Sequence, residues 1–108
     1  LSKAIEDFIT SRGYQPLVRF CGHGIGRKPH EDPEIPNYLE HGGTKSGPKI
    51  KNGMVFCIEP MICQKDRNPV ILKNGWDVVS ADGLRGSHYE HTVAVVDGRA
   101  VILSNREN

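Results

Sequence analysis

The sequence is poor in aromatic residues, in net charge and in long apolar stretches. Only 6% of its 108 residues are aromatic, and 14 Lys and Arg against 13 Asp and Glu leave a net charge of +1. A surface that binds nucleic acid through its phosphates needs an excess of basic residues. The longest apolar runs, such as Met54–Ile58, are far shorter than the roughly 18 residues that a membrane span needs. We therefore expect no membrane partner and no specific nucleic-acid partner.

The amino end also lacks the apolar core of a signal peptide, because charged residues interrupt it. Three cysteines, Cys21, Cys57 and Cys63, cannot all pair with one another, and their spacing matches no zinc-ribbon pattern. These features favour reduced thiols in the cytoplasm. Because the chain starts with Leu1 and enters a helical pattern at once, we expect it to be a single-domain piece of a longer protein.

The spacing of apolar residues predicts one helix at the amino end, over residues 2–12, followed by strands. Asn74 and Gly75 between two apolar runs predict a hairpin. The segment 27–51 contains four prolines and is expected to be mostly loop. The pattern therefore indicates an α+β fold with about five mostly antiparallel strands. The six candidate segments for them are residues 17–21, 54–62, 70–72, 76–80, 89–96 and 100–103.

Glu59 is a carboxylate within an otherwise apolar strand candidate, Met54–Ile62. Burying an unpaired charge is costly, so we expect a counterion, most simply a metal ion. Pro60 cannot donate a ladder hydrogen bond and indicates an irregular strand end at an opening. The alternatives are that Glu59 turns outward at an edge or pairs with an arginine.

Two further potential ligands stand near strand ends. Alternation places Glu90 on the same strand face as Thr92 and Ala94, although a solvated strand end would also explain it. His23 lies between two glycines that let the backbone come close to an ion or a substrate. A neutral imidazole there can bind a metal, and the alternative is a hydrogen-bonded turn residue.

Of the remaining histidines, His30 is expected at the same opening as a hydrogen-bond donor to substrate, whereas His41 and His88 are expected on the surface. One imidazole and two carboxylates form an oxygen-rich ligand set. Such a set suits Mn(II), Fe(II), Co(II) or Zn(II) in hydrolysis better than a cysteine-based structural zinc site.

Six linked motifs follow in order along the chain, and together they are far more specific than any one of them. They are Cys21-Gly-His-Gly-Ile-Gly26, His30-Glu-Asp-Pro33, Ile35-Pro-Asn-Tyr38, Gly53-Met-Val-Phe-Cys-Ile-Glu-Pro-Met61, Gly75-Trp76 and Tyr89-Glu-His-Thr92. In this order and spacing they closely resemble the carboxy-terminal half of a type I methionine aminopeptidase, of the pita-bread metallopeptidase family. The resemblance implies that residues 1–108 are a catalytic-domain fragment with one helix and a curved, mostly antiparallel sheet.

The resemblance also implies a function: metal-dependent removal of the initiator methionine from nascent polypeptides, in the cytoplasm, with the ribosome as an expected partner. Two divalent ions (Co, Mn, Fe or Zn) would be held in the complete enzyme. By matching motifs, His23 and Glu59 would bind one ion and Glu90 would bridge both. Glu59 would also take the proton from the attacking water, and His30 would hydrogen-bond the substrate amide or the oxyanion. Trp76 would form an aromatic wall beside the methionine side-chain pocket.

The chain departs from the family pattern in two respects. The family's two aspartate ligands come from the amino-terminal half, which this sequence does not contain. Pro29 stands where an aromatic residue usually faces the methionine pocket. With three of five ligands, the chain alone is expected to bind metal weakly and to have negligible peptidase activity, so the missing half is itself an expected partner.

Two alternatives remain open at the level of sequence. Pita-bread peptidases that act at X-Pro bonds usually carry Gly-x-Arg-x-Glu at the last ligand, where this chain has Tyr89-Glu-His-Thr92. A non-catalytic relative would use the fold to bind protein or RNA, but such relatives tend to lose ligands, and His23, Glu59 and Glu90 are all present.

Overall fold

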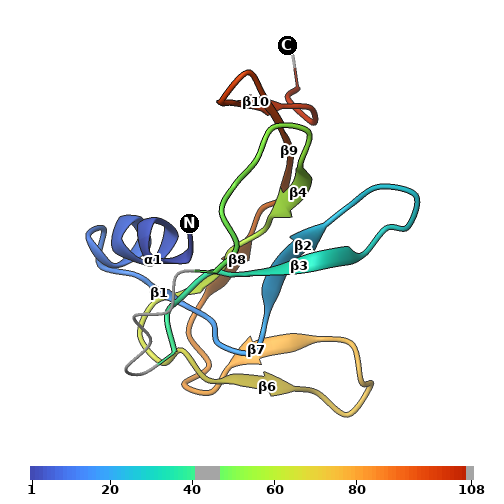
Figure 1. The fold of residues 1–108 in the computed structure, drawn as a ribbon. Helices are drawn as coiled ribbons and strands as arrows, with labels where there is room; N and C mark the ends of the chain where they lie inside the picture. Colours follow the sequence, from blue (N-terminus) through green and yellow to red (C-terminus); the bar gives the residue numbers. More distant parts are fainter. Residues whose placement is uncertain (41–46, 107–108) are drawn as a thin grey trace.

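The structure, a computed structural model, describes residues 1–40 and 47–106 (Figure 1). In these residues one helix, α1 (Ser2–Thr10), precedes a series of short strands. The strands are β1 (Gln15–Pro16), β2 (Cys21–Gly24), β3 (Glu31–Pro36), β4 (Val55–Ile58), β5 (Met61–Cys63), β6 (Pro69–Ile71), β7 (Val78–Ser80), β8 (Gly86–His88), β9 (His91–Val96) and β10 (Arg99–Ile102). The predicted α+β class is confirmed.

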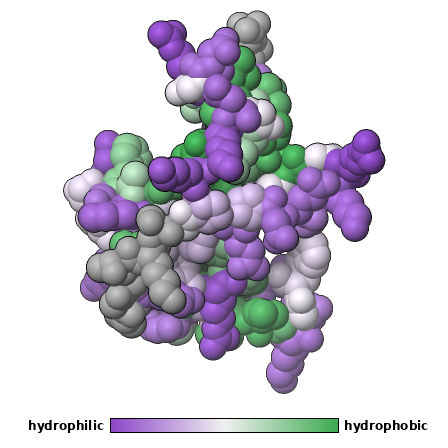
Figure 2. Space-filling view, in the orientation of Figure 1, coloured by the Kyte–Doolittle hydropathy of each residue, from purple (hydrophilic) through white to green (hydrophobic). Residues whose placement is uncertain are grey.

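The main sheet has five strands in the order β10-β9-β4-β2-β3, and β1-β5-β8 and β6-β7 form two smaller sheets. All of these strand pairs are antiparallel, as expected. Ile35, Phe56, Val93 and Val95 form the core of the main sheet. On the arm of the molecule formed by β9 and β10, Figure 2 shows apolar surface left exposed. Its members include Val96, Val101, Ile102 and Leu103.

The helix α1 is two residues shorter than the predicted 2–12 and has one fully buried side chain, that of Ile9. A polar contact also anchors it to the rest of the fold. The Glu6 carboxylate accepts hydrogen bonds from the Leu39 backbone N–H at 2.8 Å and from Arg67 Nη2 at 3.1 Å. No helix among the described residues has the length and apolar character needed to cross a membrane.

One predicted strand does not form, and one strand was not predicted, each for an identifiable reason. The expected strand at 17–21 does not form, because Arg19 has a positive φ of 73° that interrupts an extended chain, and β2 begins only at Cys21. The segment 27–51, expected to be mostly loop, contains β3. The proline-rich sequence of β3 is tolerated because this strand lies at the edge of the sheet.

Glu59 and Pro60 divide the predicted strand 54–62 into β4 and β5, because Pro60 has no backbone N–H to donate to a neighbouring strand. The predicted hairpin is confirmed as β6 and β7, with Gly75 at a φ of 72° in its connection. His41, expected on the surface, lies outside the described residues.

Gly22 allows strands β2 and β4 to approach closely. A Cβ atom at this position would lie 2.1 Å from the Cys57 carbonyl oxygen, which no side chain can tolerate without backbone movement. The glycine before His23 is therefore required by the packing of the sheet, independently of any bound group.

We expect Gly22→Ala to lower the free energy of unfolding by about 1–3 kcal/mol, because the added methyl group overpacks the sheet. Urea denaturation followed by circular dichroism would measure the change. Gly47→Ala is the matched control, since nothing lies within 4 Å of a Cβ atom there. Equal stability of the two variants would contradict the close approach at Gly22.

A second local constraint centres on the Asp82 carboxylate, in the turn after β7. It accepts hydrogen bonds from the backbone N–H groups of Leu84 and Asp66, each at 2.9 Å. These two bonds hold the pKa of the Asp82 carboxyl below its usual value. The turn is thus tied to the segment before β6.

We expect Asp82→Asn to be destabilising at pH 7, because the amide loses one of the two acceptors. A carboxyl whose folded-state pKa is lowered stabilises the fold above its unfolded pKa of about 4, and this contribution disappears as the pH falls through the folded pKa. The difference in denaturation midpoint between wild type and variant should therefore shrink on acidification. Asp97→Asn, at an exposed turn position with a φ of 49°, is the control for the loss of a surface carboxylate.

Candidate metal centre

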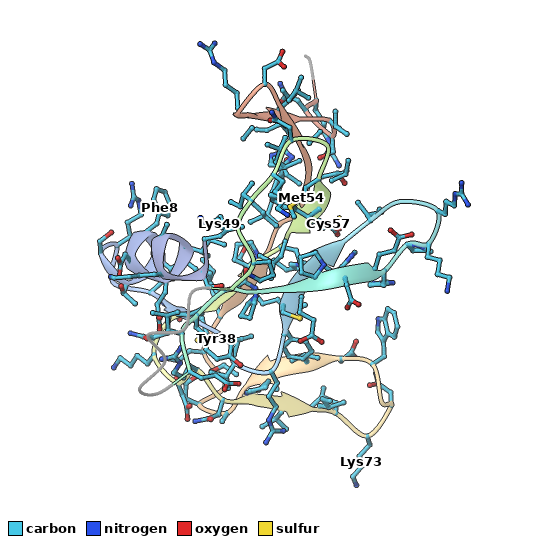
Figure 3. The ribbon with its side chains drawn as sticks, viewed as in Figure 1. Phe8, Tyr38, Lys49, Met54, Cys57 and Lys73 are labelled. Atoms are coloured by element: carbon cyan, nitrogen blue, oxygen red, sulfur yellow. The ribbon has the colours of Figure 1, made fainter. Side chains whose placement is uncertain are left out.

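The register of three neighbouring strands places a row of side chains on one face of the main sheet. His23 in β2 lies directly opposite Cys57 in β4, and Cys57 lies opposite Thr92 in β9. Side chains of directly paired residues point to the same face of an antiparallel sheet. Figure 3 shows Cys57 beside β4, near the middle of the molecule.

A second row follows two residues further along the same strands. Ile58 in β4 pairs with His91 in β9, so continuing this register by one residue places Glu59 opposite Glu90. Continuing the register of β2 and β4 by two residues from His23 and Cys57 places Cys21 opposite Glu59. Since alternate residues share a face, this second row faces the same way as the first. Glu59 and Glu90 lie just beyond the ends of β4 and β9, so the two carboxylates stand where the backbone ladder stops.

His23 and Glu59 are in direct contact. Nε2 of His23 lies 2.9 Å from Oε1 of Glu59, and their side chains are only 15% and 14% exposed. The other ring nitrogen, Nδ1, lies 2.9 Å from the Gly24 carbonyl oxygen. Only an N–H can donate to a carbonyl, so in the neutral ring Nδ1 holds the proton and Nε2 presents its lone pair to the carboxylate.

This arrangement fits a cation. Oε1 of Glu59 is buried and receives no hydrogen bond from the described residues. A lone pair and a carboxylate oxygen that face each other repel unless a proton or a metal ion lies between them. An imidazole nitrogen whose partner nitrogen donates to a backbone carbonyl is also the usual form of a metal-binding histidine.

Two groups of potential ligands share Glu90. Ligand atoms of His23, Cys57 and Glu90 lie within 4.8 Å of one another, and so do those of Glu59, His88 and Glu90. The three residues predicted as ligands from the sequence are therefore brought together pairwise. The residue common to both groups is the one to which the family resemblance assigns the bridging position.

Two members of these groups were missed in the sequence. His88 is exposed, as expected, with 43% of its side chain accessible, but its Nε2 also lies 3.4 Å from Oε2 of Glu59, which was not predicted. Cys57 was expected only as a reduced thiol. Strand alternation carried a signal for both, because His88 precedes Glu90 by two residues and Cys57 precedes Glu59 by two.

His30 lies at the same opening, as expected. The centres of its ring and of the His23 ring are 4.1 Å apart. Both line an open cavity of about 660 Å³ together with Glu59 and with Glu31 and Asp32 at the start of β3. Pro29, next to His30, is exposed.

Trp76 is separate from this cavity in the described part of the chain. It is 85% exposed, lies in the connection between β6 and β7, and is not one of the residues that line the cavity. Figure 3 shows the neighbouring Lys73 at the outer end of this hairpin. The predicted role of Trp76 at the methionine pocket stays a prediction.

The three cysteines are all protonated thiols at neutral pH in the absence of a metal. Burial raises the pKa of the Cys57 and Cys63 thiols. Burial, followed by the negative charges of Glu34 and Glu59, raises the pKa of Cys21. None of the three is in a disulfide.

Comparisons with known proteins show the family to which the chain belongs. Residues 1–97 match the family model of Metallopeptidase family M24. The chain is 64% identical over 107 residues to the methionine aminopeptidase of Helicobacter pylori, which covers 98% of this chain and 42% of that protein. The corresponding enzyme of Clostridium perfringens is 43% identical over 104 residues, covering 96% of this chain and 41% of that protein.

Among solved structures, the chain is similar to the methionine aminopeptidase from Thermotoga maritima, with a TM-score of 0.88 and 38% identity over 97% of this chain and 41% of that one. The chain thus spans about two fifths of the length of these relatives and aligns with their carboxy-terminal part. It belongs to metallopeptidase family M24 and has the carboxy-terminal part of the pita-bread fold.

Proposed function

We propose that this chain forms the carboxy-terminal part of an enzyme that removes the initiator methionine from nascent polypeptides. The observation that carries the proposal is the buried Oε1 of Glu59, which faces His23 Nε2 and lacks a hydrogen bond. The reaction is proposed from the names of the relatives. The remaining residues of the site are expected in the part of the relatives' length that this chain does not cover.

The proposed ligands are His23, Glu59 and Glu90, with two aspartates from an amino-terminal half completing a site for two divalent ions. When bound, such ions polarise the scissile carbonyl and make a nucleophile available at neutral pH. Glu90 would be the ligand shared by the two ions, and its membership of both groups of potential ligands supports this role. Cobalt, manganese, iron and zinc all suit this oxygen-rich set.

Glu59 also serves as the base in this proposal. Its Oε1 is turned toward His23, so Oε2 is the oxygen that takes the proton from the attacking water. His88 Nε2 lies 3.4 Å from Oε2 and is the neighbour of that oxygen, whereas His23 Nε2 is the neighbour of Oε1. The hydrogen bond from His23 to the Gly24 carbonyl fixes the imidazole ring, and with it the position of Oε1.

His30 is proposed to donate a hydrogen bond to the substrate amide or to the developing oxyanion. Its exposure at the cavity, beside His23, leaves its ring accessible to a peptide. Trp76 is proposed to line the methionine pocket once an amino-terminal half packs against the hairpin that carries it. The nascent chain, and the ribosome from which it emerges in the cytoplasm, are the proposed partners.

The chain alone should release no measurable methionine from a Met-Ala-Ser peptide, because three ligands cannot hold two ions. Mixed with the amino-terminal half of the 64% identical Helicobacter pylori relative, it should release methionine, and a chelator should stop the reaction. Chromatography of the released amino acid measures both reactions. Robust turnover by the chain alone would show that no missing half is needed.

In the completed enzyme, Glu90→Gln should abolish methionine release with little change in circular dichroism, because an amide bridges two cations poorly. The matched control is Glu40→Gln, at an exposed carboxylate that belongs to neither group of ligands. Activity that survives Glu90→Gln would contradict the bridging role.

His30→Ala should lower kcat of the completed enzyme by about 100-fold to 1,000-fold, the usual effect of removing one oxyanion donor. Bound metal, measured by atomic emission, should stay the same, because His30 is not a proposed ligand. Arg27→Ala, at an exposed site on the same loop, is the control. A loss of metal in His30→Ala would move His30 into the metal centre and refute the assigned role.

A further inference from the structure

His30 lies on the connection between β2 and β3, which extends away from the main sheet (Figure 1). Residues 26–30 of this connection are all exposed, so burial in the core does not fix their conformation. The His30 ring nevertheless lies with its centre 4.1 Å from that of the His23 ring, at the wall of the cavity. A side chain on so exposed a connection needs another restraint to stay at this place.

The carboxylate of Glu31, the first residue of β3, supplies such a restraint. The backbone N–H of Lys28 donates a hydrogen bond to Oε1 of Glu31 at 2.9 Å. This bond joins the two ends of a segment of four residues, 28–31, and His30 lies within that segment. A side-chain oxygen that accepts from a nearby backbone N–H fixes the path of the chain between the two residues.

The same carboxylate packs against Gly26 on the other side of the connection. A Cβ atom at position 26 would lie 2.7 Å from Oε2 of Glu31, so a larger residue there would displace the carboxylate. The N–H of Gly26 donates to the Lys28 carbonyl oxygen at 3.1 Å, which holds the two sides of the connection together. The last glycine of the Gly22–Gly26 motif thus makes room for the Glu31 side chain.

Pro29 removes most of the freedom that remains. Its ring fixes its own φ near about −65° and confines the preceding Lys28 to extended conformations. The segment 28–31 is therefore restrained by the proline within it and by the hydrogen bond across it. His30 is the residue between these two restraints.

We propose that Glu31 is a positioning residue, which holds His30 at the cavity through the hydrogen bond from the Lys28 N–H. The inference rests on the role of His30 in the proposed function. A hydrogen-bond donor is effective only when it is already aimed at the reacting group, and a misplacement of about 1 Å can cost about 100-fold in rate. Glu31 acts through His30 and not on the substrate.

The position of the ring can be observed directly by nuclear magnetic resonance of the purified chain. A nuclear Overhauser effect between ring protons of His23 and His30 is expected, because the ring centres are 4.1 Å apart. It should persist in Glu31→Gln, whose amide oxygen can still accept from the Lys28 N–H, and it should disappear in Glu31→Ala. Persistence in Glu31→Ala, or loss in both variants, would overturn the proposal.

Glu34→Ala is the matched control. Glu34 is an exposed carboxylate of the same strand, β3, and its side chain forms no hydrogen bond within residues 1–40 and 47–106. This variant should keep the Overhauser effect, and a loss there would show that the general charge of the strand holds the ring rather than the bond to Glu31.

Kinetics of the completed enzyme separate positioning from a general structural role. Glu31→Ala should lower kcat for Met-Ala-Ser by about 10-fold to 100-fold with bound metal unchanged. In a His30→Ala background the same substitution should cause no further loss, because no ring is left to position. An equal loss in both backgrounds would overturn the proposal. If His30→Ala itself leaves kcat unchanged, the role of His30 in the proposed function is wrong, and the Overhauser effects alone decide whether Glu31 holds the ring.

Discussion

The pairing register of β2, β4 and β9 is the constraint on which the rest of the centre depends. It sets His23, Cys57 and Thr92 in one row, and two residues later it brings Glu59 to Glu90. A slip of one residue in either pair would turn half of these side chains to the opposite face. Gly22 protects this register, since any larger residue would collide with the Cys57 carbonyl oxygen. The glycines beside His23 therefore serve the backbone first and the metal centre as a consequence.

The same register brings two carboxylates together, one mostly buried and one exposed. Glu59 is mostly buried, with one oxygen that receives no hydrogen bond, and Glu90 stands at the adjacent strand start. Such a pair is unfavourable without a cation, which a metal ion or a proton between His23 Nε2 and Glu59 Oε1 would supply. In the proposed function, this repulsion lowers the stability of the metal-free chain and raises its affinity for a cation, as is common at functional sites.

Local elements of the fold, and residues that belong to a sequence motif, could be predicted from the sequence. The helix at the amino end, the hairpin around Gly75 and the break after Glu59 all followed from spacing and turn chemistry. Long-range pairing did not follow, because Cys57 is 34 positions from His23 in the chain and nothing in the local pattern states which residues face each other. For that reason His88 was expected on the surface and Cys57 outside the centre. The edge strand β3 was not predicted, because its prolines are more typical of a loop than of a strand.

In the proposed function, three ligands on one sheet face have a consequence for assembly with an amino-terminal half. Because strand pairing already orients His23, little conformational entropy would be lost if an ion bound between it and Glu59. That ion would reduce the repulsion between Glu59 and Glu90 before the amino-terminal half supplies the aspartates. A second ion would need Glu90 together with those aspartates, so its affinity would report on docking of that half.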